Sequence, residues 1–261
     1  MNAFSNPFDS PDAVRARDMQ ADPLIMYIIV RRETKVTLAG LAEAVARGVL
    51  ACADKFECQT AHAGHFADWR TTSFRKVVLR ANERDWSKLL AQETVVTSKD
   101  RSGEDVIAVM PPFPKSAVSV LVRGLQAYTL SLSELEPGFW DVGSVLPPSI
   151  LLAANPNIEM SAGKLLAQVG HAAMMVIDAP VHLGAGESWS RALVYWRAMG
   201  CRFAFVPSTS TGWAAALATL PCVVVTDSGL TEVAPGSRTV IALRPASDNE
   251  RASFARCLDG D

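Results

Sequence analysis

Three polar side chains recur at helical spacing in the apolar segment AGKLLAQVGHAAM. Lys164, Gln168 and His171 are spaced i, i+4 and i+7, so on a helix they fall within an arc of roughly 60°. The opposite side carries only apolar residues, namely Leu165, Leu166, Val169 and Ala173. A solvent-facing stripe ordinarily carries several Glu and Lys residues. One cation with two neutral polar groups favours a helix that lines a cleft.

A second polar cluster follows the apolar run 222–225. Asp227 and Thr231 flank a turn made by Ser228 and Gly229. Polar residues just beyond the carboxyl end of a buried strand lie where α/β sheets usually place ligands. This cluster therefore predicts polar contacts with a ligand.

Each cluster also has a purely structural interpretation. Lys164 could be a surface lysine in a first helical turn, and His171 a hydrogen-bonded core histidine, since amphipathic helices often carry scattered polar residues. Asp227 could cap its own turn through backbone amides. Spacing alone leaves both interpretations open.

The segments around these clusters predict an α/β module. Apolar runs predict buried strands at 150–154, 202–206, 223–226 and 239–243, and helical composition predicts helices at 162–177, 188–199 and 211–220. Pro235-Gly236 lies between the last two strands. It predicts a type II turn, because glycine adopts positive φ at low cost.

The first half of the chain shows a similar order. We predict strands at 25–31, 76–80, 106–110 and 118–122, helices at 38–54 and 85–92, and a polar loop that holds His62 and His65. VVLRANERDWSKLL at 77–90 and AFVPSTSTGWAAAL at 204–217 each place a strand, a polar turn and a Trp-bearing helix in one order. These segments indicate a tandem repeat with a period of about 125 residues, longer than solenoid periods.

The expected domain organisation follows from these segments. Residues 1–22 contain four Asp and no apolar block and are expected to be a flexible tail. Residues 23–130 form the first module and 149–261 the second. Residues 131–148 are rich in Pro, Gly and Ser, which is typical of a linker.

Composition excludes several classes of protein. The 25 Lys and Arg residues are balanced by 27 Asp and Glu, and neither half is basic, so any nucleic acid must be bound by a local patch. The five cysteines contain no CxxC pair, which fits reduced thiols in a cytoplasmic protein. No apolar run approaches the roughly 20 residues that cross a bilayer, so we expect no membrane contact.

Two further patterns do not predict cofactor binding. Cys52, Cys58, His62 and His65 have a C-x5-C-x3-H-x2-H order, in which the cysteine spacing departs from the usual zinc pairs. The A-G-K tripeptide at 162–164 lacks the earlier glycine and the following Ser or Thr of a P-loop. We expect no metal and no other cofactor.

Together, the two polar clusters resemble a known family. MSAGKLLAQVGHAAM at 160–174 and TDSGLTEVAPGSRTVIALRP at 226–245 resemble, in order and spacing, the signature segments of type-2 peptidyl-tRNA hydrolases. Those segments read approximately M-x-x-G-K-x-x-A-Q-x-x-H-A and D-A-G-x-T-x-x-x-P-G. The resemblance spans residues 149–245. By position it implies that Lys164, Asp227 and Thr231 are catalytic, and that Gln168 and His171 help to bind substrate.

The resemblance also implies a fold and a reaction. It implies two similar three-layer α/β modules, each a mixed sheet of roughly four strands with helices on both faces, and a peptidyl-tRNA substrate hydrolysed without a metal. Asp227 would orient or deprotonate water, Lys164 would stabilise the oxyanion or bind the terminal phosphate, and Thr231 would supply a hydrogen bond. The sequence offers no activated Ser or Cys nucleophile, so direct attack by water is favoured.

The sequence departs from the family pattern at the first strand of the second module. Asn155 and Asn157 stand where the family usually has an Arg and, two residues on, an Asp. These two asparagines are the expected substrate contacts of that strand. Loss of the Arg removes a charge that would bind phosphate.

The first module retains that Arg as Arg31, in YIIVRRETKV at 27–36, with Glu33 near the Asp position. Its helix lacks the lysine, the Ala-Gln pair and the histidine, and no DxGxT segment is found, since DVIAVMPPFP ends in apolar residues. We expect a silent copy that replaces the second subunit of the family dimer as an internal pseudo-dimer. Basic residues of this copy would help to hold tRNA, or would equally fit a solvated face: Arg31, Arg32, Arg75, Lys76 and Arg80.

Two alternatives to a hydrolase remain open. The chain could be a catalytically silent tandem pseudoenzyme that binds tRNA ends or a protein partner, which Asn155 and Asn157 favour. A structural scaffold is the third possibility, but it leaves the polar stripe unexplained. The intact Lys164, Asp227 and Thr231 favour the enzyme.

Overall fold

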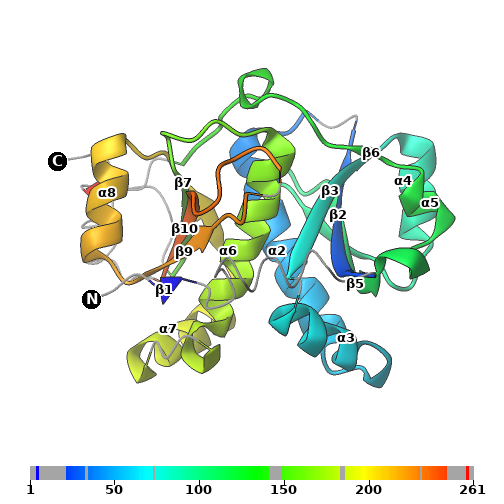
Figure 1. Ribbon diagram of the computed structural model, residues 1–261, viewed down its shortest axis with the longest axis horizontal. Coiled ribbons are helices and arrows are strands. Elements are labelled where there is room, and N and C mark those ends of the chain that lie inside the picture. The colour runs from blue at the N-terminus through cyan, green and yellow to red at the C-terminus, as the bar shows by residue number, and fades with distance from the viewer. Residues whose placement is uncertain are drawn as a thin grey trace.

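The computed structural model describes residues 4–5, 22–32, 35–72, 74–140, 148–182, 186–229, 231–245 and 257–258. Its strands form two mixed sheets with long helices between them (Figure 1). The predicted α/β class with two mixed-sheet modules is confirmed. Within the described residues, no helix combines the length and the apolar character that a membrane span requires.

The first sheet has the strand order β4-β5-β2-β3-β6. Its half of the chain contains β2 (Leu24–Arg31), α2 (Leu38–Phe56), α3 (Thr60–Thr71), β3 (Arg75–Ala81), α4 (Glu83–Leu90), β4 (Val96–Lys99), β5 (Asp105–Pro114), η1 (Lys115–Ala117), α5 (Val120–Arg123), β6 (Gln126–Ala127) and η2 (Leu132–Glu134). β2 runs parallel to β3 and antiparallel to β5.

The second sheet has the order β1-β9-β10-β7-β8. Its elements are β1 (Phe4–Ser5), β7 (Ile150–Ala154), α6 (Ala162–His182), α7 (Glu187–Ala198), β8 (Phe203–Phe205), α8 (Ser210–Thr219), β9 (Cys222–Thr226) and β10 (Arg238–Leu243). β7 runs parallel to β8 and antiparallel to β10, which pairs antiparallel with β9. Four strands in the order β9-β10-β7-β8 thus repeat the pairing of β4-β5-β2-β3.

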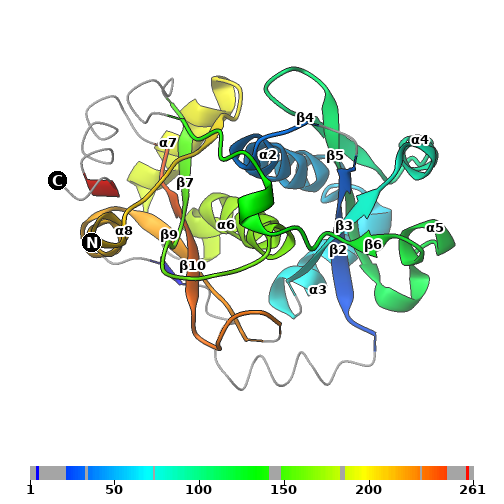
Figure 2. The same ribbon diagram turned by 90° about the horizontal axis from the view of Figure 1, so that it is seen from above.

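Each sheet is covered by helices on both faces. α2 and α6 pack against each other between the sheets (Figure 2), and their apolar residues belong to one core shared by both halves. The outer face of the first sheet buries Trp86 and Leu89 of α4, and that of the second buries Trp213 of α8. The chain therefore has a common central core and two smaller outer ones.

Two local predictions for the first half were wrong. His62 and His65 lie on α3 rather than in a loop, because this helix buries Phe66 and Trp69 against the shared core. The predicted strand at 118–122 is instead a short helix, since the Ser119 side chain accepts a hydrogen bond from Val122 N and so caps a helical turn. The strand β4 was not predicted.

The turn between β9 and β10 was predicted correctly. Gly236 has a φ of 81°, and Ser237 N donates to Ala234 O at 3.1 Å. A positive φ at the third position and this hydrogen bond define a type II turn.

The predicted tail and linker are described in part. Phe4 and Ser5 pair in parallel with β9, and the rest of 1–21 lies outside the described residues. The linker contains η2, where Ser131 and Glu134 form a capping box. Residues 141–147 also lie outside the described part of the chain.

Polar contacts join the two halves around the shared core. Glu43 on α2 is 2% exposed, and its carboxylate binds Arg101 through two hydrogen bonds and accepts one from Phe205 N of β8 at 3.1 Å. Arg70 of the first half pairs with Asp178 of the second at 3.2 Å. The halves are therefore fixed to each other rather than tethered.

The segment before the linker covers the first turn of α6. Ala162 N donates to Leu130 O at 2.8 Å, which satisfies one of the amides that a helix start leaves unpaired. Gly163 packs directly below Tyr128, because a Cβ at this position would lie 1.9 Å from the Tyr128 carbonyl oxygen. Only glycine permits this approach.

The variant Gly163→Ala should therefore destabilise the protein, by about 1 to 3 kcal/mol, because α6 or the Tyr128 backbone must move. Urea unfolding measures the change. The control is Gly64→Ala on the exposed face of α3, where a Cβ meets nothing within 4 Å, and it should leave the free energy of unfolding equal or raise it by up to about 1 kcal/mol. Equal midpoints for the two variants would contradict this packing.

Candidate active site

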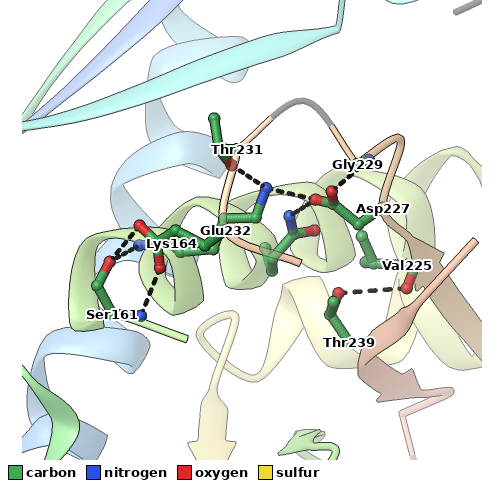
Figure 3. Close-up of polar contacts among 9 residues, drawn as sticks. Ser161, Lys164, Val225, Asp227, Gly229, Thr231, Glu232 and Thr239 are labelled. Carbon is green, nitrogen blue, oxygen red and sulfur yellow. Dashed lines mark hydrogen bonds and ion pairs between the residues drawn. The ribbon is translucent and has the colours of Figure 1, made fainter. Parts of the chain in front are cut away.

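The start of α6 is fixed by a carboxylate from the turn that follows β9. Glu232 accepts hydrogen bonds from Ser161 N at 2.6 Å and from Ser161 Oγ at 2.8 Å. The same Ser161 Oγ accepts from Lys164 N at 3.2 Å and caps the first turn. The turn and the helix start are thereby locked together (Figure 3).

Lys164 and Asp227 form an ion pair across this junction. Lys164 Nζ lies 2.5 Å from Asp227 Oδ2 and donates to Thr231 Oγ1 at 2.9 Å. The side chain of Lys164 is 13% exposed and that of Asp227 is 7% exposed. Figure 3 shows the ammonium group between the aspartate and the threonine. The three residues predicted to be catalytic are thus in direct contact.

The Asp227 carboxylate has further partners. Oδ2 accepts from Gln168 Nε2 at 2.6 Å, and Oδ1 accepts from Gly229 N at 2.8 Å. Gly229 has a φ of 75°, and a Cβ there would lie 2.4 Å from Pro235, so the turn requires glycine. Asp227 therefore caps its turn, as the structural interpretation predicted, and also binds the residues of α6.

Gln168 leaves one buried acceptor without a partner. Its side chain is 4% exposed, and its Oε1 has no hydrogen-bond partner within the described part of the chain. The amide orientation is fixed by chemistry, because only the NH₂ group can face the Asp227 carboxylate. An unsatisfied buried oxygen beside an ion pair is suited to a donor from a ligand or from water.

His171, the last residue of the polar stripe, meets the first half of the chain. Lys76 Nζ on β3 lies 3.2 Å from His171 Nδ1, and the His171 ring packs against Phe74 at 5.0 Å between centroids. The Lys76 ammonium also lies over the rings of Phe74 and Trp69, at 3.8 and 4.3 Å from their centroids. Burial lowers the pKa of Lys76 well below its ordinary value, against the attraction of Asp178.

A cleft of about 600 Å³ contains these groups. The predicted residues that line it are Lys164, Gln168, His171, Asp227 and Thr231. The first half contributes Ile25, Phe74, Arg75, Lys76, Val77, Val78, Ala127, Tyr128 and Thr129. The cleft is therefore formed by both halves of the chain.

Three predicted substrate contacts do not line this cleft. Asn155 donates to Arg238 O at 2.8 Å and accepts from Asn157 N at 3.0 Å, while Asn157 Oδ1 accepts from Ser210 Oγ. Arg31 forms an ion pair with Glu83. Each of the three has a role in holding local structure.

Lys76 is the cleft residue whose position the sequence analysis missed. It was counted among basic residues that could hold tRNA, whereas its side chain is buried. The available signal was the period of two along RKVVLR, which puts Lys76 on the same face of β3 as Val78.

The burial of Lys76 predicts a pH dependence of stability. An unfolded lysine titrates near pH 10.4, and in the folded protein the pKa of Lys76 is lowered by burial. At a pH between these two pKa values, Lys76 is protonated in the unfolded chain and deprotonated in the folded protein, so folding releases a proton. The free energy of unfolding that Lys76 contributes therefore rises with pH and is lost as the pH falls. We expect the difference in stability between Lys76→Met and the wild type to shift in favour of the wild type as the pH rises toward about 10.

Urea unfolding at each pH measures this difference. Lys88→Met is the matched control, because Lys88 is 51% exposed and its charge is solvated in both states. The difference between that variant and the wild type should not vary with pH. A Lys76→Met curve parallel to the wild type would show that the ammonium is not destabilised by burial.

The fold and the cleft define an α/β protein in which a helix lysine and an aspartate at the carboxyl end of a sheet strand share one pocket. The model of the family Peptidyl-tRNA hydrolase PTH2 matches residues 149–259. A peptidyl-tRNA hydrolase of Pyrobaculum aerophilum is 31% identical over 103 residues, which cover 37% of this chain and 83% of that protein. The chain belongs to the PTH2 family.

Proposed function

We propose that this protein hydrolyses the ester that joins a peptide or an N-acyl amino acid to tRNA. The observation that carries the proposal is the contact of Lys164, Asp227 and Thr231 inside one cleft of a PTH2-family chain. The relative from Pyrobaculum aerophilum bears the name peptidyl-tRNA hydrolase, which supports the same substrate here.

The dimensions of the cleft suit the reacting end of that substrate. Its volume of about 600 Å³ lies within the range of roughly 300 to 1,000 Å³ typical of small-molecule sites. An acyl ester with its ribose fits such a space, whereas the body of a tRNA stays outside. Neither half of the chain is strongly basic, so the body of the tRNA must be bound by a local patch.

Lys164 is placed to stabilise negative charge on the ester carbonyl. An ammonium has three N–H donors, and two of them are directed to Asp227 and Thr231. The third is available for the oxyanion of the tetrahedral intermediate. The ion pair keeps the ammonium in place before the substrate arrives, and such preorganised donors account for much of the rate of acyl transfer enzymes.

Asp227 and Gln168 provide acceptors for the attacking water. Asp227 Oδ1 uses one lone pair for Gly229 N and retains one for water, and the unpartnered Gln168 Oε1 is a second acceptor. Water oxygen bonds to the carbonyl carbon and gives its proton to Asp227. The bond to the ribose oxygen then breaks, and this oxygen takes the proton.

Thr231 assists the leaving oxygen. Its Oγ1 accepts a hydrogen bond from Lys164, so its own O–H is free to donate. A hydrogen bond from this hydroxyl to the ester oxygen would stabilise the alkoxide that forms as the bond breaks.

We also propose that the first half is a silent copy of the same module and serves as an internal second subunit. The repeated strand pairing and the packing of α2 against α6 support this. The pairing makes β4 the counterpart of β9, so the turn after β4 corresponds to the Asp227 turn. There, among the described residues, the Asp100 carboxylate accepts hydrogen bonds from its own turn, including those from Ser102 N and Glu104 N. The neighbouring Arg101 pairs with Glu43 of α2.

The decisive test of hydrolysis is Lys164→Ala. We expect kcat to fall by roughly 10²- to 10³-fold, because one preorganised oxyanion donor is lost, while circular dichroism and the melting temperature show a folded protein. The measurement is release of acyl amino acid from an N-acetylated aminoacyl-tRNA. Lys88→Ala, an exposed lysine on α4, is the control and should retain wild-type kcat.

Two outcomes would count against the proposal. Full activity of Lys164→Ala would remove the assignment of that residue. Wild-type protein that binds the acylated tRNA without releasing the acyl group would indicate a binding module instead of a hydrolase.

A further inference from the structure

The second wall of the cleft comes from residues outside the family match. The match begins at residue 149 and includes α6 and the turn after β9, which carry the reacting groups. The opposite wall is made by the first half, chiefly by β2, β3 and the segment at 127–129. This wall contributes no catalytic group, so its chemistry bears on what the cleft accepts.

Contacts between the walls give the order of residues along the cleft. At one end Gly163 meets the Tyr128 carbonyl, and Tyr128 N donates to Val78 O. Further along, Gly170 lies against the Lys76 side chain. β3 therefore runs beside α6, with Val78 near the helix start and Phe74 toward Met175.

The two ends of the cleft differ in polarity. Lys164 and Asp227 lie at the start of α6, whereas the far end is lined by the side chains of Phe74 and Met175. From Lys164 to Met175 the helix rises about 16 Å, at 1.5 Å per residue. The cleft thus passes from an ion pair to an apolar end.

Phe74 is held at that end by an unusual backbone. Its φ is 47°, a conformation that bulky residues rarely adopt and that is retained where the surrounding structure enforces it. Phe74 N donates to Trp69 O at 2.7 Å, and its ring contacts Trp69 at 4.6 Å and His171 at 5.0 Å between centroids. The ring is therefore a fixed part of the wall.

The apolar end is a poor site for phosphate. The ammonium of Lys76 is buried, with two aromatic rings and His171 as its close neighbours. Arg75 alternates with Lys76 along β3, so its side chain projects from the face of the strand opposite that of Lys76. The apolar end of the cleft therefore suits the acyl side chain of the ester, whereas it does not suit the ribose phosphate.

We propose that this end of the cleft binds the side chain of the amino acid esterified to tRNA, and that it favours large apolar side chains. The inference rests on the proposed ester hydrolysis at Lys164 and Asp227. His171 lies about 10 Å along the helix from Lys164, which is of the order of the length of an extended aminoacyl group. The first half of the chain is then a determinant of specificity.

The test uses the full chain and a single tRNA charged in turn with N-acetyl-phenylalanine, N-acetyl-leucine and N-acetylglycine, so that only the acyl side chain differs. We expect kcat/KM for the first two to exceed that for the glycine ester by roughly 10- to 100-fold, the range for burial of an apolar group in a pocket. Equal values for all three would overturn the acyl site. Absence of hydrolysis with every ester would overturn the proposed function as well.

A variant that fills the apolar end with a larger side chain shows whether this space binds the acyl side chain or the terminal nucleoside. Met175 lines the apolar end of the cleft, and Met175→Trp, which fills that end, should lower kcat/KM for the phenylalanine ester by about tenfold or more, with little effect on the glycine ester. Ala198→Leu, at an exposed position near the end of α7, should change neither. An equal loss on all esters would show that the space binds a part common to them, such as the terminal nucleoside, and would refute the inference.

A second variant tests the same inference if the first does not fold. Phe74→Ala enlarges the apolar end from the first-half wall, because the Phe74 ring lines the cleft beside His171, and it should lower kcat/KM for the phenylalanine ester selectively, by about tenfold. Melting temperatures identify which variants are folded. If folded Phe74→Ala retains the wild-type preference, the first half does not set the specificity.

Discussion

The structure of the cleft depends on the ion pair between Lys164 and Asp227. The Asp227 side chain is 7% exposed, and a carboxylate so far removed from water is stable only with charged or hydrogen-bonding partners. Lys164, Gln168 and Gly229 N supply them. Because these partners come from a helix and from a turn, neutralising the carboxylate also fixes the relative positions of α6 and the turn after β9. The geometry of the candidate site and the local stability therefore have one cause.

The first half of the chain shapes the same cleft. Gly163 fits against Tyr128, and Lys76 reaches His171, so two points of α6 are held from the opposite sheet. The shared core and the buried Glu43 prevent the halves from separating without exposing apolar surface and charge. The second half alone would lose one wall of its cleft.

The sequence predicted the α/β class, the polar stripe and the Asp227 turn, because these depend on local period and spacing. Lys164, Gln168 and His171 project from one face of α6 at intervals that any helix imposes. Asn155, Asn157 and Arg31 were assigned by position in a resemblance, but contacts between strands and loops decide where their side chains lie: each binds its own neighbours. The burial of Lys76 was not predicted, because it depends on Trp69, Phe74 and α6, which the tertiary structure brings together.

The counterpart turns of the two halves show why local sequence cannot separate a site from a cap. Asp100 and Asp227 each follow a strand, and each accepts a hydrogen bond from a backbone amide of its own turn. Each turn contains a glycine with positive φ, Gly103 in the first half and Gly229 in the second. The difference lies on the helix opposite. α6 presents Lys164 to its aspartate, whereas α2 presents Glu43, which pairs with Arg101 instead. An aspartate in such a turn thus becomes a candidate catalytic group when it pairs with a cation from a distant helix and also lies in an open cleft. Both conditions are properties of the packing of the chain rather than of the turn.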